Sequence, residues 1–292
     1  MKVTGFSFIK NAVKFDYPVA EAIRSILPLC DEVVVAVGDS EDETRELIAA
    51  IDPAKIRIID TVWDPSLREG GAVLANETNK ALRAIGNESD WCFYIQGDEV
   101  LHEQYLEPVR KAMLQWKDHP EVDGLLFRYK HFYGSFDYTA SSSEWYRNEV
   151  RVVRADPGIY SYRDAQGFRK DNDQKLRVKD SHATIYHYGW VRPPKIMMDK
   201  KRNFGNYWGG DRVDEQFLKT YSGDFDYSQV DALEKFTGSH PAVMKERIAR
   251  MNWQFDYDLS YNNLSLKDHF KNFMEKWTGI RPFDYKNYIL LR

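Results

Sequence analysis

The strongest constraint on the fold is a regular alternation of apolar and amphipathic segments over the first hundred residues. Short apolar runs, typical of buried strands, occupy 2–9, 32–37, 55–60 and 91–95. Segments with a helical pattern lie between them at 17–29, 38–51 and 66–85. This alternation predicts an α/β fold with a mostly parallel, Rossmann-like central sheet and helices on both of its faces.

Two short polar motifs indicate where helices begin. Ser40 and Glu43 have the Ser-x-x-Glu spacing of a capping box, and so do Ser66 and Glu69. In such a box the two side chains bond the free backbone N–H groups of a first helical turn. We therefore expect a helix to open at each motif.

The pattern changes beyond residue 116, which ends a further predicted helix. Longer strand-like runs at 122–134 and 148–155 predict antiparallel additions to the sheet, whereas 155–240 predicts loops and short elements because its periodicity is weak. Segments 242–255 and 266–279 predict a helical C-terminal tail. We expect a first half at 1–130, loops of the same domain at 131–240 and the tail at 241–292.

Composition excludes several classes of function. The 292 residues carry a formal net charge of −4, so no broad positive field favours a nucleic-acid partner. No apolar stretch is long enough to cross a bilayer, although peripheral contact with a membrane stays open. The two cysteines, Cys30 and Cys92, lie far apart in apolar contexts, which favours reduced thiols and a cytoplasmic location.

Polar residues that follow the predicted strands are the candidates for chemistry. Ligands of open parallel sheets bind beyond the carboxyl ends of the strands. One strand ends in Gly38 and Asp39, and another ends in Gln96, Gly97 and Asp98. Two such ends in one half of a sheet predict a nucleotide site.

Asp98 is the candidate metal ligand. A carboxylate beside a glycine is placed to hold Mg²⁺ or Mn²⁺, hard ions that take few protein oxygens and complete their shells with phosphates and water. The alternative is that Asp98 and Glu99 only start the next element and keep a loop hydrated.

Together, segments 8–48 and 95–101 resemble the nucleotide-sugar half of a family 2 glycosyltransferase with the GT-A fold, over roughly residues 3–130. The resemblance implies sugar transfer, with inversion, from a donor of the UDP or GDP type to a glycan, lipid-linked or protein hydroxyl acceptor. It makes 1–130 the nucleotide-sugar half and 131–240 the acceptor side. The donor-binding residues that we predict are Asn11, Gly38, Asp39, Arg68, Asn79, Gln96 and Gly97.

The motifs depart from the family pattern at two positions. Gln96 stands where the Asp-x-Asp metal motif of the family has its first aspartate, and Ala12 stands where the family often has a glutamate. A glutamine oxygen still accepts hydrogen bonds and can approach a cation. Asp98 therefore remains the main predicted carboxylate.

An inverting transferase needs a general base on the acceptor side. Asp164 is the first candidate and Asp171 the second, since both lie in the loop-like stretch 160–173; the alternative is an ordinary charged surface loop. Glu149 alternates with apolar residues, which predicts that it faces away from them. His187 is a candidate second metal ligand, and a hydrogen-bonded structural histidine is its alternative.

Aromatic and basic residues of the second half are the candidates for substrate contacts. Rings beside glycines and charges suit the faces of a sugar. The predicted acceptor-binding residues are Trp145, Tyr146, Trp190 and Trp208. A basic group is placed either to meet a diphosphate or to form a solvated face, and it comprises Arg192, Lys195, Lys200, Lys201 and Arg202.

These observations predict a metal-dependent glycosyltransferase. A non-catalytic nucleotide-sugar-binding module with a degenerate metal motif is the main alternative. A nucleotidyltransferase and a methyltransferase are both disfavoured, because no glycine-rich loop follows the first strand.

Overall fold

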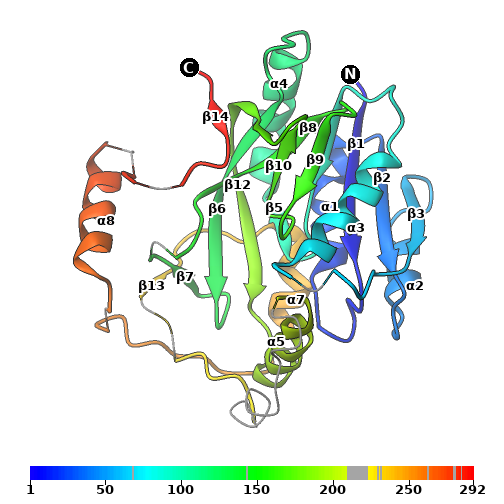
Figure 1. Cartoon of the computed structure of the whole chain (residues 1–292). Helices are drawn as coiled ribbons and strands as arrows, with labels where there is room; N and C mark the ends of the chain where they lie inside the picture. Colours follow the sequence, from blue (N-terminus) through cyan, green and yellow to red (C-terminus); the bar gives the residue numbers. More distant parts are fainter. Residues whose placement is uncertain are drawn as a thin grey trace.

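The computed structural model describes residues 1–67, 69–142, 144–208, 223–228, 230, 232–261, 263–278, 281–283 and 285–292. Its main sheet runs in the order β13-β7-β6-β8-β4-β1-β2-β3, and β12 extends it by pairing with β5, β6 and β14 (Figure 1). A second, three-stranded sheet has the order β11-β10-β9. The predicted α/β architecture is confirmed.

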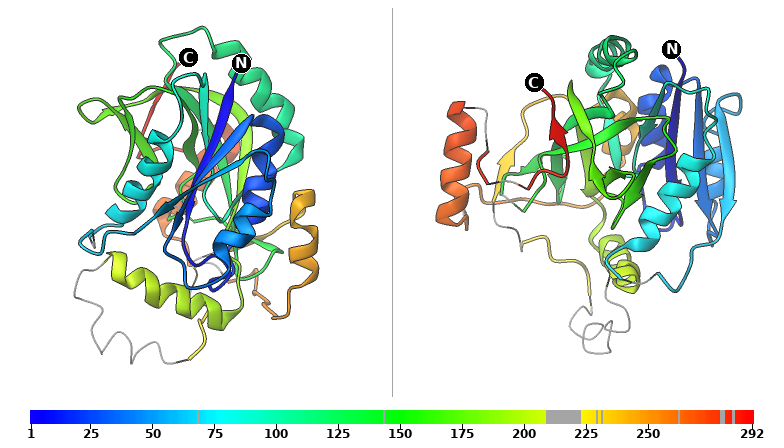
Figure 2. Two further views of the ribbon diagram at one scale, coloured as in Figure 1. Left: turned by 90° about the vertical axis from the view of Figure 1, so that its right-hand side faces the viewer. Right: turned by 45° about the horizontal axis from the view of Figure 1, so that its top comes forward.

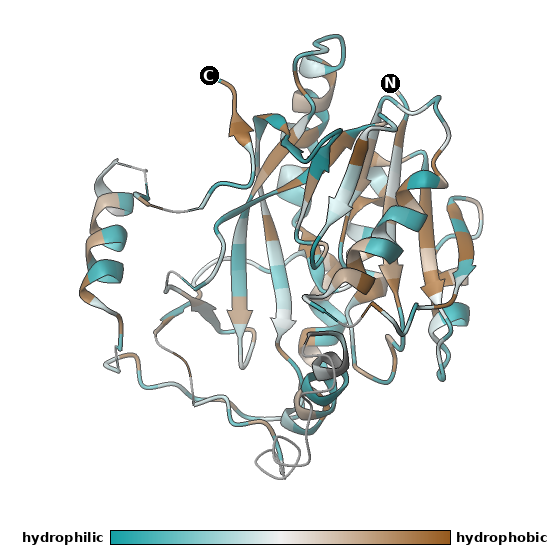
Figure 3. Cartoon of the chain, in the orientation of Figure 1, coloured by the Kyte–Doolittle hydropathy of each residue, from teal (hydrophilic) through white to brown (hydrophobic). Residues whose placement is uncertain are grey.

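The first half of the sheet is parallel, as the alternation predicted. It consists of β1 (Val3–Ile9), β2 (Glu32–Gly38), β3 (Ile56–Thr61) and β4 (Trp91–Tyr94), in the order β3-β2-β1-β4. Successive residues of β2 enter opposite cores, because Val33 and Val35 pack with one cluster while Val34 and Ala36 pack with another. Apolar side chains on both faces give β2 a continuous hydrophobic run from Val33 to Val37, and β2 is mostly brown in Figure 3.

Helices cover both faces of this half. On one face lie α1 (Val19–Ile26) and α4 (Leu106–Trp116), and on the other lies α3 (Ala72–Arg83). The two views of Figure 2 show the sheet between these layers. The remaining short element here is α2 (Thr44–Ala49).

Both predicted capping boxes are wrong. Helix α2 begins at Thr44 with no side-chain cap, because the Ser40 hydroxyl instead donates to the carbonyl of Gly38. Helix α3 begins at Ala72 after Gly70 and Gly71, whose positive φ angles give a left-handed turn that glycine adopts without strain. The serine of the second motif bonds a neighbouring aspartate side chain rather than the helix.

The second half adds antiparallel strands, as predicted. Strand β8 (Asn148–Arg154) runs antiparallel to β4 and β6 (Gly124–Tyr133). The edge continues through β7 (Tyr138–Ala140) and β13 (Leu233–Lys235). Strand β5 (Glu99–Leu101) pairs with β12, which in turn runs parallel to β6.

The prediction that 155–240 holds only loops and short elements is wrong in part. This region contains β12 (Arg177–Trp190), of 14 residues, and α5 (Pro194–Trp208), of 15 residues. A register shift between Asp180 and Thr184 interrupts the two-residue period of β12, which explains the weak pattern in the sequence. The short strands of the region are β9 (Ile159–Tyr162), β10 (Gly167–Lys170) and β11 (Gln174–Lys175).

The C-terminal tail is less helical than predicted. Only α7 (Lys245–Ala249) and the preceding turn at Ala242–Met244 form in the first predicted helix, whereas α8 (Leu266–Thr278) matches the second. After α7 the chain turns so that Phe255 packs directly on Gly134, where a Cβ atom would lie 2.5 Å from the ring. The tail ends in β14 (Ile289–Leu290), which pairs in parallel with β12.

The remaining global predictions concern thiols and membranes. Cys30 and Cys92 are both buried and unpaired with each other, as expected. Among the described helices, none has the length and apolar character needed to cross a bilayer.

Candidate functional site

A cavity of about 190 Å³ lies where β1, β3 and β4 end. All three strands belong to one parallel half-sheet, in which β2 separates β3 from β1, so the residues after them gather at one edge. The cavity is lined by Phe8, Ile9, Lys10, Phe15, Tyr17, Trp63, Leu74, Gln96, Gly97, Asp98, Asp164, His187, Lys200, Asn203 and Tyr207. Five predicted site residues, Gln96, Gly97, Asp98, Asp164 and His187, therefore share one cavity.

Asp98 lies in this cavity surrounded by cationic and imidazole groups. Its carboxylate is 3.4 Å from Nζ of Lys200 and 3.8 Å from Nη2 of Arg192. Burial would raise the pKa of Asp98, but the attraction of Lys200, His187 and Arg192 outweighs burial and lowers it to about 2. The carboxylate is therefore ionised at physiological pH.

The neighbouring carboxylate, Glu99, has a different role. It is fully buried and forms a two-pronged ion pair with Arg151, with N···O distances of 2.7 and 2.9 Å. Its Oε1 also accepts a hydrogen bond of 2.7 Å from Tyr129. Successive residues of a strand point to opposite sides, so Asp98 faces the cavity while Glu99 anchors the core.

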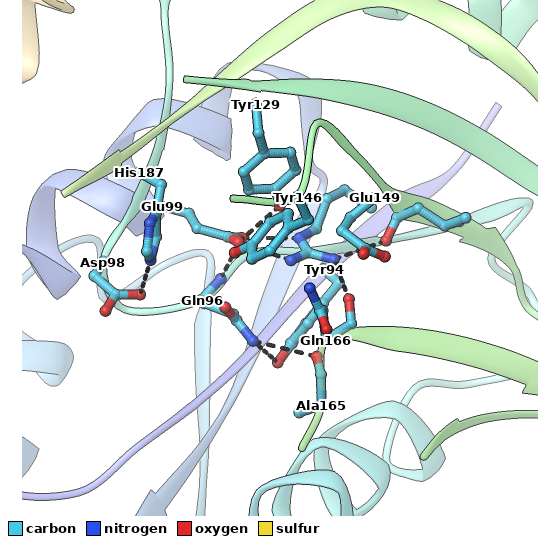
Figure 4. Close-up of polar contacts among 12 residues, drawn as sticks. Tyr94, Gln96, Asp98, Glu99, Tyr129, Tyr146, Glu149, Ala165, Gln166 and His187 are labelled. Carbon is cyan, nitrogen blue, oxygen red and sulfur yellow. Dashed lines mark hydrogen bonds and ion pairs between the residues drawn. The ribbon is translucent and has the colours of Figure 1, made fainter. Parts of the chain in front are cut away.

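Gln96 ties the Asp164 loop to the end of β4. Its Nε2 donates to the carbonyl of Ala165 and to the hydroxyl of Tyr94, each at 3.2 Å (Figure 4). Arg151 holds the same loop by donating to the carbonyl of Gln166 at 2.9 Å. The loop joins β9 and β10, and Gln96 thus positions Asp164.

His187 presents a lone pair to the cavity. Its Nδ1 is 2.9 Å from Nδ1 of His131, whose Nε2 is 2.7 Å from the carbonyl of Tyr146. The carbonyl can only accept, so His131 donates from Nε2 and accepts at Nδ1 from the Nδ1–H of His187. Burial lowers the pKa of His187 and, with His187 itself, that of His131, so both rings are neutral. Nε2 of His187 is consequently unprotonated.

The Asp98 and His187 donors fit a divalent cation. Their Oδ1 and Nε2 atoms are 3.7 Å apart, too far for a hydrogen bond. Two ligand distances of about 2.1 Å each can span that separation. Among the described residues no group of three or more His, Cys, Asp or Glu side chains is suited to a metal, so an ion here would draw its other ligands from substrate and water.

A buried basic pair borders the same carboxylate. Arg192 is fully buried and donates from Nε to the carbonyl of Phe15 at 2.8 Å, whereas its Nη2 has no hydrogen-bond partner among the described residues. Burial and Arg192 lower the pKa of Lys200 to about 7, against the attraction of Asp98. Gly189 keeps this space open, because a Cβ there would lie 2.6 Å from the His187 ring.

Aromatic side chains form the opposite wall, and the sequence analysis missed them. Trp63 follows β3, lies 5.9 Å from Phe8 and 5.3 Å from Tyr207 between ring centroids, and is approached by Lys10. Its buried Nε1 has no hydrogen-bond partner among the described residues. A Cβ on Gly38 would lie 2.5 Å from that nitrogen, so the glycine is what admits the indole. The position of Trp63 three residues after the predicted strand 55–60 was the available signal.

The predicted donor-binding residues Asn11, Asp39 and Asn79 do not line this cavity. Asn11 accepts at its side chain from the backbone N–H of Glu41 at 2.8 Å, which joins the loops after β1 and β2. Asp39 is paired with Lys10 at 2.7 Å and places that lysine at the cavity. Asn79 on α3 exchanges two hydrogen bonds with the backbone of β9. Arg68 lies outside the described residues.

A larger cavity, of about 950 Å³, adjoins the other side of the Asp164 loop. Asp164 lines both cavities. The larger cavity is also lined by the predicted acceptor residues Trp145 and Tyr146, by Glu149 and by the C-terminal tail. Glu149 is buried rather than turned to solvent and accepts from Nδ2 of Asn287 at 3.2 Å, which fastens the tail to β8.

The remaining predicted residues lie elsewhere. Trp190 stacks on Tyr133 at 5.7 Å within an aromatic cluster and lines neither cavity. Asp171 is exposed in the turn after β10. The side chain of Trp208 lies outside the described residues.

Comparisons with family models and with curated proteins give no match. Among solved structures, the chain is similar to S. aureus TarS 1–349 in complex with UDP, with 14% identity, a TM-score of 0.42 and coverage of 76% of this chain and 69% of that one. Glucosyl-3-phosphoglycerate synthase from Mycobacterium tuberculosis, in complex with Mn²⁺, UDP and phosphoglyceric acid, has 18% identity, a TM-score of 0.30 and coverage of 45% and 43%. Mannosyl-3-phosphoglycerate synthase from Rubrobacter xylanophilus has 19% identity, a TM-score of 0.30 and coverage of 47% and 42%. Since these TM-scores are low, the functional assignment depends on the residues of this chain.

Proposed function

We propose that this chain is a glycosyltransferase of the GT-A, family 2-like type that transfers a sugar from a nucleoside diphosphate to a hydroxyl acceptor. The observation that carries the proposal is the position of Asp164 between two cavities. One cavity holds the Asp98 and His187 donors, and the other is large enough for a second substrate. A carboxylate on their common border is placed to act on both substrates.

The smaller cavity suits the nucleotide and its diphosphate. The indole of Trp63 offers a flat face to a base and an unused N–H to a base carbonyl. Lys200 and Arg192 lie beside Asp98 and supply positive charge for phosphate oxygens. An arriving phosphate would favour the charged form of Lys200, whose pKa near 7 leaves it partly neutral at physiological pH.

Asp98 and His187 would hold Mg²⁺ or Mn²⁺, and such an ion would offset the negative charge that develops on the leaving diphosphate. In the transfer step, Asp164 accepts the proton of the acceptor hydroxyl while the oxygen of that hydroxyl bonds to the anomeric carbon of the donor sugar. The bond from that carbon to the diphosphate oxygen breaks, and attack from the opposite side inverts the configuration. Gln96 and Arg151 hold the base in position through the loop backbone.

The larger cavity is the proposed acceptor site. Trp145 and Tyr146 supply aromatic side chains to its lining. The tail supplies Lys271, Glu275, Arg281, Phe283, Tyr285, Lys286, Asn287, Tyr288 and Leu290. We therefore propose donor binding by 1–130, acceptor binding by 131–240 and closure of the acceptor site by 241–292. A glycan, a lipid-linked saccharide or a glycosylated protein would all present the required hydroxyl.

A non-catalytic module that binds sugar nucleotides is the second candidate. The contacts of Lys200 and Arg192 with Asp98 favour it, because they already balance the carboxylate charge without a metal. The two candidates differ in whether a metal and a reaction accompany binding.

Thermal unfolding with UDP or GDP, with and without Mn²⁺, tests the proposal. A ligand at about one hundred times its dissociation constant stabilises the folded state by about 2.7 kcal/mol. We expect Mn²⁺ to increase the nucleotide-dependent shift in wild type, and we expect Asp98→Asn to lose that increase. Asp60→Asn is the matched control, since Asp60 pairs with Arg45 on the exposed part of β3.

Turnover separates the two candidates. Release of the nucleoside diphosphate from a sugar nucleotide in the presence of an acceptor panel supports the transferase. Binding without release across the panel supports the module, and a melting temperature that no nucleotide changes rules out both.

A further inference from the structure

Helix α8 carries an apolar stripe that nothing in the described chain covers. Leu266, Phe270, Phe273 and Trp277 are spaced by four, three and four residues, which places them on one face of the helix. Their exposed fractions are 90%, 50%, 58% and 75%. Helices that pack on a globular core bury such a stripe, whereas α8 exposes its apolar stripe to solvent.

The opposite face of α8 is the one that meets the protein. Lys271 and Glu275 line the larger cavity, and Arg281 donates to Glu275 at 2.6 Å. Figures 1 and 2 show α8 at the margin of the molecule, apart from the helices that cover the sheet. The chain after α8 is anchored to the main sheet, because β14 pairs with β12 and Asn287 bonds Glu149.

The flanking segments extend the same character. Large apolar side chains are also exposed on both sides of α8, and these are Leu259, Tyr261, Phe283 and Tyr285. Phe, Trp and Tyr are the residues that settle at the boundary between lipid headgroups and acyl chains.

Charge selects the surface that would cover the stripe. Residues 266–292 contain six basic and three acidic residues, a net charge of +3, whereas the whole chain has −4. An anionic surface would attract this segment and repel the rest of the molecule, which orients α8 toward it. A second copy of the chain is less suited, because four side chains are few beside the roughly 20–30 residues a side of a stable interface.

We propose that the apolar face of α8 (Leu266, Phe270, Phe273 and Trp277) docks on an anionic lipid surface. The helix would lie in the plane of the lipid headgroups. Because its other face lines the larger cavity, docking would place that cavity beside the lipid surface. This inference concerns a surface that the proposed sugar transfer does not use. It stands or falls independently of that function.

Co-sedimentation of the full chain with vesicles tests the docking. We expect binding to vesicles that contain phosphatidylglycerol, weaker binding to phosphatidylcholine alone, and loss of the extra binding to phosphatidylglycerol at high salt. The triple variant Leu266→Ser, Phe273→Ser, Trp277→Ser removes three exposed apolar side chains that the docked helix would bury in the lipid. Each is worth about tenfold or more in affinity, so the variant should not sediment.

Leu114→Ser is the matched control, because Leu114 is an exposed leucine on α4. The control should bind as wild type does, and circular dichroism shows whether the triple variant is folded. A second measurement uses brominated acyl chains, which should quench wild-type fluorescence more than that of Trp277→Phe. Failure of wild type to bind, equal binding of the triple variant, or concentration-dependent dimerisation that the triple variant abolishes would each overturn the proposal.

Discussion

Glu149 makes the stability of this protein depend on pH in an unusual direction. Burial raises the pKa of its carboxyl to about 8, although the positive charge of Arg151 opposes the rise. In the unfolded chain the same group titrates near 4.5. Between these values the folded protein holds a proton that the unfolded chain has released. The stability from this group is therefore fully present below pH 4.5 and is lost as pH rises toward 8.

The size of the effect follows from the two pKa values. Each pH unit inside the window changes the free energy of unfolding by about 1.4 kcal/mol. From about pH 6 to about pH 8, after allowing for titration at the upper end, this group lowers that free energy by about 2 kcal/mol. Glu149→Gln cannot titrate, and its amide oxygen still accepts from Asn287. We therefore expect the free energy of unfolding of Glu149→Gln not to show this pH-dependent decrease.

Urea denaturation followed by circular dichroism at three pH values measures the difference. The comparison is the change in unfolding free energy with pH, so a uniform effect of the substitution cancels. Glu144→Gln serves as the control, because Glu144 is exposed on the same side of the larger cavity. Identical pH dependence of wild type and Glu149→Gln would refute the assignment of a buried, protonated carboxyl.

Three further substitutions test other parts of the site. Arg151→Met leaves Glu99 buried without its cation and should lower the free energy of unfolding by about 3–5 kcal/mol in urea; Arg128→Met, which breaks an exposed pair, should lower it by less than about 1 kcal/mol. His131→Phe removes the acceptor that orients the imidazole of His187, the proposed metal ligand, and should weaken Mn²⁺ binding about 10–100-fold by calorimetry. Asp164→Asn should keep the nucleotide-dependent thermal shift while turnover falls about 10²–10⁴-fold. Equal losses of stability for the two arginine variants would contradict the role given to Arg151. Unchanged Mn²⁺ affinity of His131→Phe would contradict the role of His131, and unchanged turnover of Asp164→Asn that of Asp164.

The local pattern of the sequence was sufficient for the parallel half of the fold. In β4 every position is apolar, and β2 is apolar from Val33 to Val37, because both sheet faces are covered; the polar residues that line the site begin where these strands end. For this reason the sequence alone identifies Asp98 as a candidate, because it follows a glycine just after the end of a predicted strand. The role of Glu99, one residue later, could not be predicted in this way. Its partner Arg151 lies on a strand 52 residues away in the sequence.

The convergence of side chains depended on strand order and register. His131 and His187 meet because β6 and β12 pair in a register that sets these two residues side by side, across 56 residues of sequence. The register shift that hides β12 in the sequence belongs to the same pairing. Trp63 becomes part of the cavity only because Gly38 on the adjacent strand has no side chain to exclude it.

Over roughly the first hundred residues, the sequence by itself determined where strands form and which residues follow them, because periodicity records which face of each element is buried. Tertiary structure alone decided which of those ends share a cavity, how the Asp164 loop is held by Gln96 and which face of α8 remains uncovered. Those outcomes depend on contacts between residues far apart in the chain, and no local pattern encodes such contacts.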